Sequence, residues 1–238
     1  MRTNQSSTQA PQIIAIDGPA ASGKSTVGAE LADQLGYLCL DTGIMYRAIT
    51  WLALTEGINP EDEASVTRLA QTIEIDVQPG SVADGRAFDV LINHQDHTWD
   101  IRLPEVNQHV SLISSYAGVR AAMTLQQRKI ASRGRIVMLG RDIGTVVLPD
   151  AGLKIYLDAS LKVRAKRRYE EEKARGSSVT YQQVVASLRR RDKIDSSRKY
   201  APLKIADDAV VINTEALSVA QVVEQINALI APPAAPVS

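Results

Sequence analysis

The sequence is short of the residues that mark several classes of protein. Cys39 is its single cysteine, so no disulfide can form within the chain, and this fits a reducing cytoplasm. No stretch reaches the roughly 18 consecutive apolar residues that a membrane-spanning helix needs. The first dozen residues are polar and lack the apolar run of a secretory signal. We therefore expect a cytoplasmic protein without membrane association, with disordered tails at residues 1–12 and 231–238.

The chain also lacks a net charge of either sign. It has 27 Lys and Arg against 27 Asp and Glu, so the overall composition does not indicate nucleic-acid binding. Residues 160–200 are an exception, with 13 Lys or Arg against 5 Asp or Glu. Such a segment attracts anions, either counterions from solvent or bound phosphates. Only Tyr169, Tyr181 and Tyr200 lie among these basic residues, which disfavours a surface that binds nucleic acid by base stacking.

Five short apolar segments are typical of buried strands. They are continuous rather than alternating, as expected for a parallel sheet that is covered on both faces. Helical patterns follow several of them: Val27, Leu31 and Leu35 recur at four-residue spacing, and Ser218 with Gln221 is placed to form a capping box. The predicted strands are Ile13–Ile16, Tyr37–Leu40, Ile136–Leu139, Lys154–Leu157 and Ala209–Ile212. Strands that alternate with helices predict an α/β sandwich with right-handed crossovers.

The interval from about residue 76 to 103 departs from this alternation. Within it, Phe88, Val90 and Ile92 alternate like a half-exposed strand, and a helical pattern follows over residues 104–132. We therefore predict a single domain in which an insert on the side of the acceptor substrate interrupts the core. The predicted boundaries are 13–230 for the domain, 13–42 and 131–230 for the core, and 43–130 for the insert.

The segment GPAASGKST at residues 18–26 matches the phosphate-binding pattern G-x-x-x-x-G-K-[ST], the P-loop. It follows a predicted strand and opens a predicted helix, where backbone N–H groups and the helix N-terminus can receive phosphate oxygens. Lys24 would neutralise the outer phosphates, and the Ser25 hydroxyl can coordinate Mg²⁺. The residues predicted to bind a nucleoside triphosphate are Gly18, Pro19, Ala20, Ala21, Ser22, Gly23, Lys24, Ser25 and Thr26.

Two further absences narrow the class of P-loop protein. The chain has no Asn-Lys-x-Asp segment with which a GTPase reads guanine. The acid that motors and helicases carry at the end of the Walker B strand is also missing, because the third predicted strand ends in Leu139 before Gly140. Residues 146–150 (VVLPD) resemble such a strand superficially, but Pro149 indicates a loop. A small-molecule kinase fits better.

Arginine is abundant where such a kinase needs it. Arg47 and Arg141 follow predicted strand ends, and the basic segment contributes Arg164, Arg167, Arg168, Arg191 and Arg198. One arginine on a basic helix is usually just solvated, whereas a cluster in a chain with a P-loop favours phosphate binding. No histidine or cysteine is placed as a general base. A phosphate acceptor needs none, because it is mostly dianionic at pH 7.

Several longer motifs extend the pattern over residues 13–230. They are IDGPAASGKST (16–26), LDTGIMYR (40–47), IRLPEVNQHVS (101–111), GRDIGTVVLPDA (140–151), KIYLDAS (154–160), RAKRR (164–168) and RRDKIDSSRKYAPL (190–203). Together they resemble the bacterial-type cytidylate kinases, which are nucleoside monophosphate kinases. The resemblance implies a P-loop nucleoside triphosphate hydrolase-like three-layer sandwich with a five-stranded parallel sheet, a monophosphate-binding insert and a lid at about 160–180. It also implies phosphoryl transfer from ATP to CMP or dCMP, with Mg²⁺ as cofactor.

The resemblance further implies roles for individual residues. The set implied for CMP binding is Thr42, Arg47, Ser111, Arg120, Arg141, Asp142, Arg191, Asp195 and Arg198, and the set implied for catalysis is Lys24, Arg141, Arg164 and Arg168. Arg47 and Arg141 would hold the acceptor phosphate. Ser111, Arg120 and Asp142 would read the cytosine edge, whose amino group suits a carboxylate and whose acceptors suit a hydroxyl and a guanidinium. Asp195 and Arg191 would contact the sugar.

One position departs from the family pattern. Many relatives have an acid directly before GRD, where this chain has Leu139. We therefore expect Ser25, the phosphates and water to hold Mg²⁺, with Asp41 behind them. Two alternatives stay open at this point: another monophosphate specificity such as UMP, and a P-loop regulator whose basic segment binds RNA. We expect a monomer, because closure on two substrates needs lobes that move freely.

Overall fold

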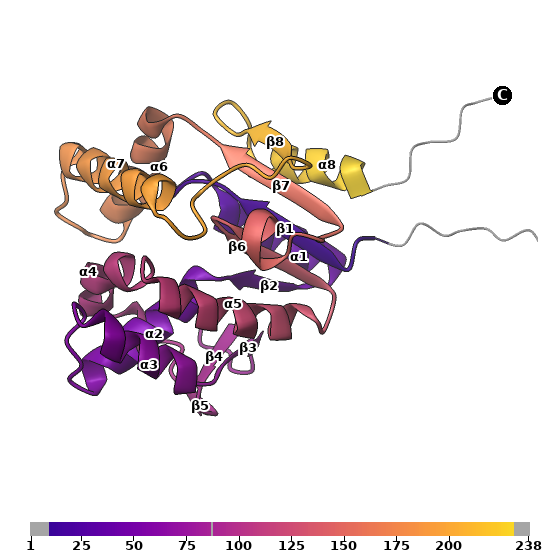
Figure 1. Ribbon diagram of the computed structural model, residues 1–238. Helices are drawn as coiled ribbons and strands as arrows, with labels where there is room; N and C mark the ends of the chain where they lie inside the picture. Colours follow the sequence, from indigo (N-terminus) through magenta and orange to yellow (C-terminus); the bar gives the residue numbers. More distant parts are fainter. Residues whose placement is uncertain (1–9, 87, 231–238) are drawn as a thin grey trace, which may run out of the picture.

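The computed structural model describes residues 10–86 and 88–230 (Figure 1). Its main sheet has five parallel strands in the order β2-β6-β1-β7-β8. The strands are β1 (Ile13–Asp17), β2 (Leu38–Asp41), β6 (Ile136–Gly140), β7 (Leu153–Asp158) and β8 (Val210–Asn213). Each predicted strand is confirmed to within one residue at either end. Of the predicted tails, residues 1–9 and 231–238 lie outside the described residues.

One face of the sheet is covered by α1 (Lys24–Leu35) and α8 (Val219–Ile230). Alternate residues of β1 point to opposite faces: Ile14 and Ile16 pack under these two helices, whereas Ala15 joins the apolar cluster on the other face. The predicted capping box before α8 is confirmed. The Gln221 N–H donates to the Ser218 hydroxyl at 3.3 Å, and the Ser218 N–H donates to the Gln221 amide oxygen at 2.9 Å.

The insert, which we call the acceptor lobe, covers the other face. It comprises α2 (Gly43–Thr55), α3 (Glu63–Thr72), the antiparallel strands β3 (Ile75–Pro79), β4 (Phe88–Ile92) and β5 (Gln95–Asp96), η1 (Asp100–Arg102), α4 (Pro104–Ile113) and α5 (Ala117–Ala131). Met45 and Ile49 of α2 belong to the same apolar cluster as Leu40 and Met138 of the sheet. The lobe therefore packs directly on the sheet, and its treatment as a separate substrate lobe stays a prediction.

The helical pattern predicted over residues 104–132 is interrupted. α4 ends at Ile113, and α5 begins only at Ala117. The hydroxyl groups of Ser114 and Ser115 donate to the carbonyls of Ser111 and Leu112 at 3.1 and 2.6 Å. Such local side-chain bonds compete with the helical ladder, so two consecutive serines favour a break.

α6 (Leu161–Ala174) and α7 (Tyr181–Ser197) pack against each other above the ends of the strands (Figure 1). Their buried contact with the core is small: Ala165, Val184 and Leu188 form an apolar cluster with Ala20 of the P-loop. The predicted lid at about 160–180 spans α6 and the turn that follows it. Among the described residues, no helix is long and apolar enough to cross a bilayer.

Candidate active site

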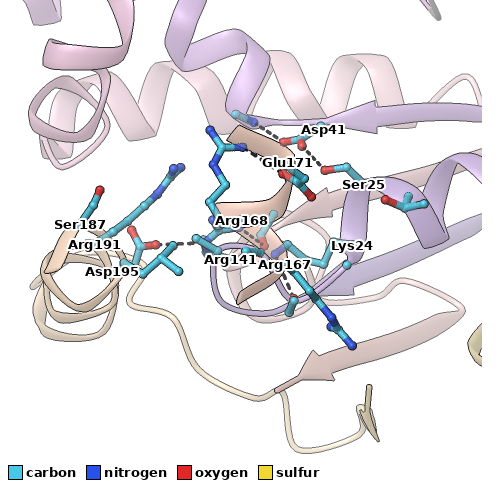
Figure 2. A pocket seen from close by; sticks show the side chains of 18 of the residues that line it. Lys24, Ser25, Asp41, Arg141, Arg167, Arg168, Glu171, Ser187, Arg191 and Asp195 are labelled. Carbon is cyan, nitrogen blue, oxygen red and sulfur yellow. Dashed lines mark hydrogen bonds and ion pairs between the residues drawn. The ribbon is translucent and has the colours of Figure 1, made fainter. Parts of the chain in front are cut away.

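A cleft of about 1020 Å³ lies at the carboxyl ends of the strands, where ligands bind in open α/β sheets. Figure 2 shows Lys24 and Ser25 on one side of it, with Arg191 and Asp195 of α7 on the opposite side. Its basic lining residues are Lys24, Arg47, Arg120, Arg141, Arg167, Arg168, Arg175, Arg191 and Arg198, and its acidic ones are Asp41, Asp142, Glu171, Glu172 and Asp195. This excess of positive charge suits anionic ligands.

The P-loop has the backbone geometry of a phosphate cradle. Gly18 has a φ of 148°, and a Cβ at this position would lie 2.2 Å from the Leu157 carbonyl oxygen. Gly23 precedes α1 in the left-handed region with a φ of 97° and leaves the first turn without a side-chain cap. Ala21 also has a positive φ, 60°, which a residue with a Cβ adopts only when the surrounding structure enforces it. The N–H groups at the start of α1 thus stay available to a phosphate.

Lys24 is buried within this loop, and no carboxylate of residues 10–86 or 88–230 accepts a hydrogen bond from it. Its ammonium group donates to the Pro19 carbonyl at 2.7 Å and to the Ser22 hydroxyl at 3.4 Å. Burial holds the pKa of Lys24 well below its usual value, and the positive charge of Arg141 lowers that pKa further. A polyphosphate beside Lys24 would favour its charged form, so the loop suits an anionic ligand.

Ser25, in the first turn of α1, and Asp41, the last residue of β2, form a hydrogen-bonded pair. The Ser25 hydroxyl donates to the Asp41 carboxylate at 2.9 Å, as Figure 2 shows, and the other Asp41 oxygen accepts the Gly43 N–H at 3.0 Å. A hydroxyl and a carboxylate are oxygen donors of the kind that Mg²⁺ prefers. Among the described residues, no three His, Cys, Asp or Glu side chains gather to hold a metal unaided. Any cation here would therefore need ligands from substrate phosphates and water.

Leu139, which stands where many relatives have an acid, contributes nothing to this pair. Its side chain is buried and packs against α1, where a Cβ on Gly28 would come within 2.6 Å of it. Glycine in the interior of a helix costs about 1 kcal/mol relative to alanine, and here it makes room for the leucine. Asp41 is thus the carboxylate that faces Ser25.

The opposite half of the cleft holds buried ion pairs. Arg120 of α5 donates to both carboxylate oxygens of Asp142 at 2.6 Å, and both side chains are buried. Arg198 contacts Asp142 at 3.3 Å and Asp195 at 3.5 Å. Arg141 donates to Asp195 at 3.0 Å. The network links α5, the loop after β6 and α7, so three distant segments of the chain set its geometry.

Arg47 of α2 and Thr42, which connects β2 to α2, also line this half of the cleft. The Arg47 guanidinium donates to the Asn107 side chain at 2.7 Å and to the Ile101 carbonyl at 3.3 Å. The Thr42 hydroxyl donates to the Leu139 carbonyl at 2.9 Å. These neutral partners hold the Arg47 charge in place without neutralising it, so it can still bind a phosphate.

Most of the residues selected from the sequence line this single cleft. They are Ala20 to Thr26 of the P-loop, Thr42, Arg47, Arg120, Arg141, Asp142, Arg168, Arg191, Asp195 and Arg198. Gly18 and Pro19 lie at the base of the loop. Like Gly18 and Pro19, two further selected residues do not line the cleft. Ser111 lies on α4 between Val110 and Ser114, which do, and Arg164 is buried.

Arg164 connects three elements behind the P-loop. Its guanidinium donates to the Ala20 carbonyl at 3.1 Å and to the Ala159 carbonyl at 2.9 Å. It also pairs with Asp192 of α7 at 2.6 Å. In this arrangement Arg164 fixes α6 to the loop rather than facing a ligand.

Some lining residues were not selected from the sequence. Arg175 directly follows the end of α6, seven residues after Arg168, a helical spacing that could have identified it. Ser114 lines the cleft because α4 ends there, and the sequence gives no signal for that ending beyond the two serines. In the segment that resembled a Walker B strand, residues 146–150, the first two residues end a π-helix, η2 (Ile143–Val147), which was not predicted from the sequence. Pro149 and Asp150 then lie in a turn, so the predicted loop at Pro149 is confirmed.

The P-loop and the arginine-rich half of the cleft opposite it define a P-loop phosphotransferase. A family model described as cytidylate kinase matches residues 14–231. The chain is 47% identical to the cytidylate kinase of Herpetosiphon aurantiacus, over 92% of this chain and 94% of that one, and 49% identical to that of Chloroflexus aggregans, over 89% and 90%. Among solved structures, shikimate kinase from Acinetobacter baumannii gives a TM-score of 0.45 at 17% identity, covering 94% of each chain. The chain belongs to the cytidylate kinase family.

Proposed function

We propose that the protein transfers the γ-phosphoryl group of ATP to CMP or dCMP, giving ADP and CDP or dCDP. The observation that carries this proposal is that a P-loop and a buried arginine–carboxylate network open into the same cleft. A nucleoside triphosphatase would need only the first of these. Membership of the cytidylate kinase family supports the choice of acceptor.

On the donor half, the P-loop N–H groups and Lys24 bind the β- and γ-phosphates of ATP. Ser25, with Asp41 hydrogen-bonded to it, would hold Mg²⁺ together with the phosphates and water. The ion supplies charge neutralisation on the transferring phosphoryl group and fixes its orientation. Arg168 on α6 reaches the cleft from above and adds positive charge near the transferring group.

On the acceptor half, Arg47 and Arg141 hold the phosphate of CMP. The Asp142 carboxylate accepts a hydrogen bond from the cytosine amino group, while Arg120 donates to an acceptor on the base edge. Asp195 and Arg191 contact the sugar. This geometry discriminates bases because uracil presents a carbonyl oxygen where cytosine presents an amino donor, and that oxygen would face the Asp142 carboxylate.

The reaction needs no protein base. The acceptor phosphate is mostly dianionic at pH 7, so its oxygen attacks the γ-phosphorus once the two are held in line. The protein therefore contributes positioning and charge stabilisation. Movement of the lid over the cleft would exclude water and limit hydrolysis of ATP. We propose a cytoplasmic monomer that binds neither nucleic acid nor membranes.

A coupled assay for ADP, with ATP and Mg²⁺ and each of CMP, dCMP, UMP and AMP, tests the proposal. We expect CMP or dCMP to give the highest kcat/KM, and the preference over UMP to fall in Arg120→Ala and Asp142→Ala. A clear preference for AMP, or unaltered base selectivity in both variants, would contradict the acceptor assignment. A filter-binding titration with RNA at increasing salt addresses the nucleic-acid alternative, for which we expect no specific binding.

A further inference from the structure

Asp17 is a buried carboxylate that none of the roles above uses. It is the last residue of β1, the central strand, and directly precedes Gly18 of the P-loop; only 5% of it is exposed. One carboxylate oxygen accepts the Ile143 N–H at 2.9 Å, and the other accepts the Gly144 N–H at 2.8 Å. These two residues begin η2, so Asp17 ties the strand that carries the P-loop to a segment of the acceptor half.

The two bonds replace a cap that η2 would otherwise take from the residue directly before it. The first N–H groups of a helix have no acceptor inside the helix, and an aspartate in the preceding position usually supplies one. That preceding residue is Asp142, yet its side chain makes no capping bond. Its carboxylate faces Arg120 instead. Asp17 therefore caps η2 in place of Asp142.

The packing around Asp17 favours this arrangement. A Cβ on Gly144 would lie 3.1 Å from the Lys154 side chain and 3.5 Å from the Asp17 carboxylate, so the close approach of the backbone suits glycine. Burial raises the pKa of Asp17 to about 6, with the two N–H groups opposing this rise and Asp142 adding to it. At pH 7 the carboxylate is mainly ionised and offers both oxygens as acceptors. π-helical turns also occur often at functional sites.

We propose that Asp17 is a positioning residue for the acceptor: by capping η2 from β1, it leaves the Asp142 carboxylate free to hold Arg120 and the acceptor base. The inference rests on the proposed function of the site. Without Asp17, the Asp142 carboxylate turns back to accept the N–H groups of Ile143 and Gly144. The acceptor half then loses the Arg120–Asp142 pair that contacts the base. Asp17 also acts on Lys24 through its charge, but the donor half keeps its own hydrogen bonds, so the larger loss falls on the acceptor.

The test is steady-state kinetics of Asp17→Ala with CMP, UMP and ATP varied in turn. We expect the KM for CMP to rise about tenfold or more and the preference for CMP over UMP to fall by a similar factor, with the KM for ATP within about twofold. Asp17→Asn keeps an acceptor oxygen for one N–H group and should give an intermediate effect. Asp62→Ala is the matched control, because Asp62 caps α3 at the Ser65 N–H, 3.1 Å away and outside the cleft. It removes a carboxylate cap and should change neither KM.

A double variant separates positioning from general damage. Because Asp17 acts through Asp142, adding Asp17→Ala to Asp142→Ala should change the KM for CMP by less than about twofold further. Equal rises in both KM values, a loss confined to kcat, or additive effects in the double variant would overturn the inference. If Asp17→Ala does not fold, the same cycle is run with Asp17→Asn. A wild-type protein inactive on CMP would overturn the proposed function as well, whereas an active wild type with unchanged KM values in Asp17→Ala would overturn the role of Asp17 alone.

Discussion

The two halves of the cleft hold their positive charges in different ways. On the donor half, Lys24 is surrounded by neutral oxygens, and burial lowers its pKa. On the acceptor half, Arg120 and Arg141 are already paired with Asp142 and Asp195. A polyphosphate would therefore favour the charged form of Lys24, whereas the arginines of the acceptor half already have carboxylate partners within the protein. We infer that the donor half mainly supplies charge for the reaction and the acceptor half mainly supplies selectivity.

The largest effect should come from removing the donor charge. Lys24→Met keeps much of the length of the side chain and removes the ammonium group, so kcat should fall by about 1,000-fold. Stability should be unchanged or slightly higher, because burial disfavours the charged form of Lys24. Single-turnover kinetics and thermal unfolding measure the two. A kcat within about tenfold of wild type would show that the loop amides bind the phosphates without Lys24, and would break the comparison.

The acceptor half should respond in the opposite manner, with a large loss of stability. Arg120→Ala leaves Asp142 buried with Arg198 as its one charged partner among the described residues, and breaking such a pair costs about 3 to 5 kcal/mol. Urea unfolding measures this. Arg86→Ala is a matched control, because Arg86 also holds several carboxylates, among them Asp89 at 3.1 Å, but lies in the acceptor lobe away from the cleft. Both variants should unfold more easily, and only Arg120→Ala should lose preference for CMP over UMP.

The link between the halves should give stability a pH dependence. The pKa of Asp17 is raised from 3.8 to about 6, so the folded state holds this proton more tightly than the unfolded chain. The stability that Asp17 contributes is therefore complete below about pH 4 and is lost as pH rises through about 6, a change of about 3 kcal/mol. Unfolding by urea at several pH values, compared between wild type and Asp17→Asn, isolates it. A difference that stayed flat from pH 4 to 7 would mean that Asp17 is ionised throughout.

Substitutions at Asp41 and Ser25, the residues proposed to hold Mg²⁺, should have a smaller effect than the changes above. Asp41→Asn keeps an oxygen for the Gly43 N–H but removes the charge beside Ser25, so affinity for Mg²⁺ in the presence of ATP should fall about tenfold. Electron paramagnetic resonance with Mn²⁺ reports on binding independently of turnover. Ser25→Ala should weaken binding in parallel. Unchanged Mg²⁺ dependence in Ser25→Ala would refute the assignment of this pair.

The sheet was predictable because its chemistry is local. Five continuous apolar segments gave strand positions to within one residue, and the P-loop motif placed the donor half through its spacing alone. The acceptor half was less accessible. Arg120 and Asp142 were selected through a family resemblance, and nothing in their separation of 22 residues indicates that they form a bidentate pair.

The remainder could not be read from the sequence because it depends on contacts between distant segments. The hydrogen bond from the Ile143 N–H to Asp17 joins residues that are 126 positions apart in the sequence. The π-helix that it caps is only five residues long, which is too short for a periodic pattern of apolar residues to reveal it. The sequence shows that Leu139 stands where many relatives have an acid. Its contact with Gly28 is visible only in the structure, because it depends on how β6 packs against α1. Properties of this kind belong to the folded arrangement, not to a sequence window.

The smallest effect is expected at the ion pairs of Arg168 on the donor half. Removing one of them tests whether these pairs fix the position of an arginine as the pairs of the acceptor half do. Arg168 pairs with Glu171 at 3.3 Å and with Glu172 at 2.7 Å, but its side chain is 42% exposed. Exposed pairs contribute about 0 to 1 kcal/mol, so Glu172→Gln should change the KM for ATP by less than about twofold and stability by less than about 1 kcal/mol. Kinetics at low and high salt measure this. A change of tenfold would show that Glu172 holds Arg168 away from ATP, and the donor half would then be as pre-arranged by carboxylates as the acceptor half.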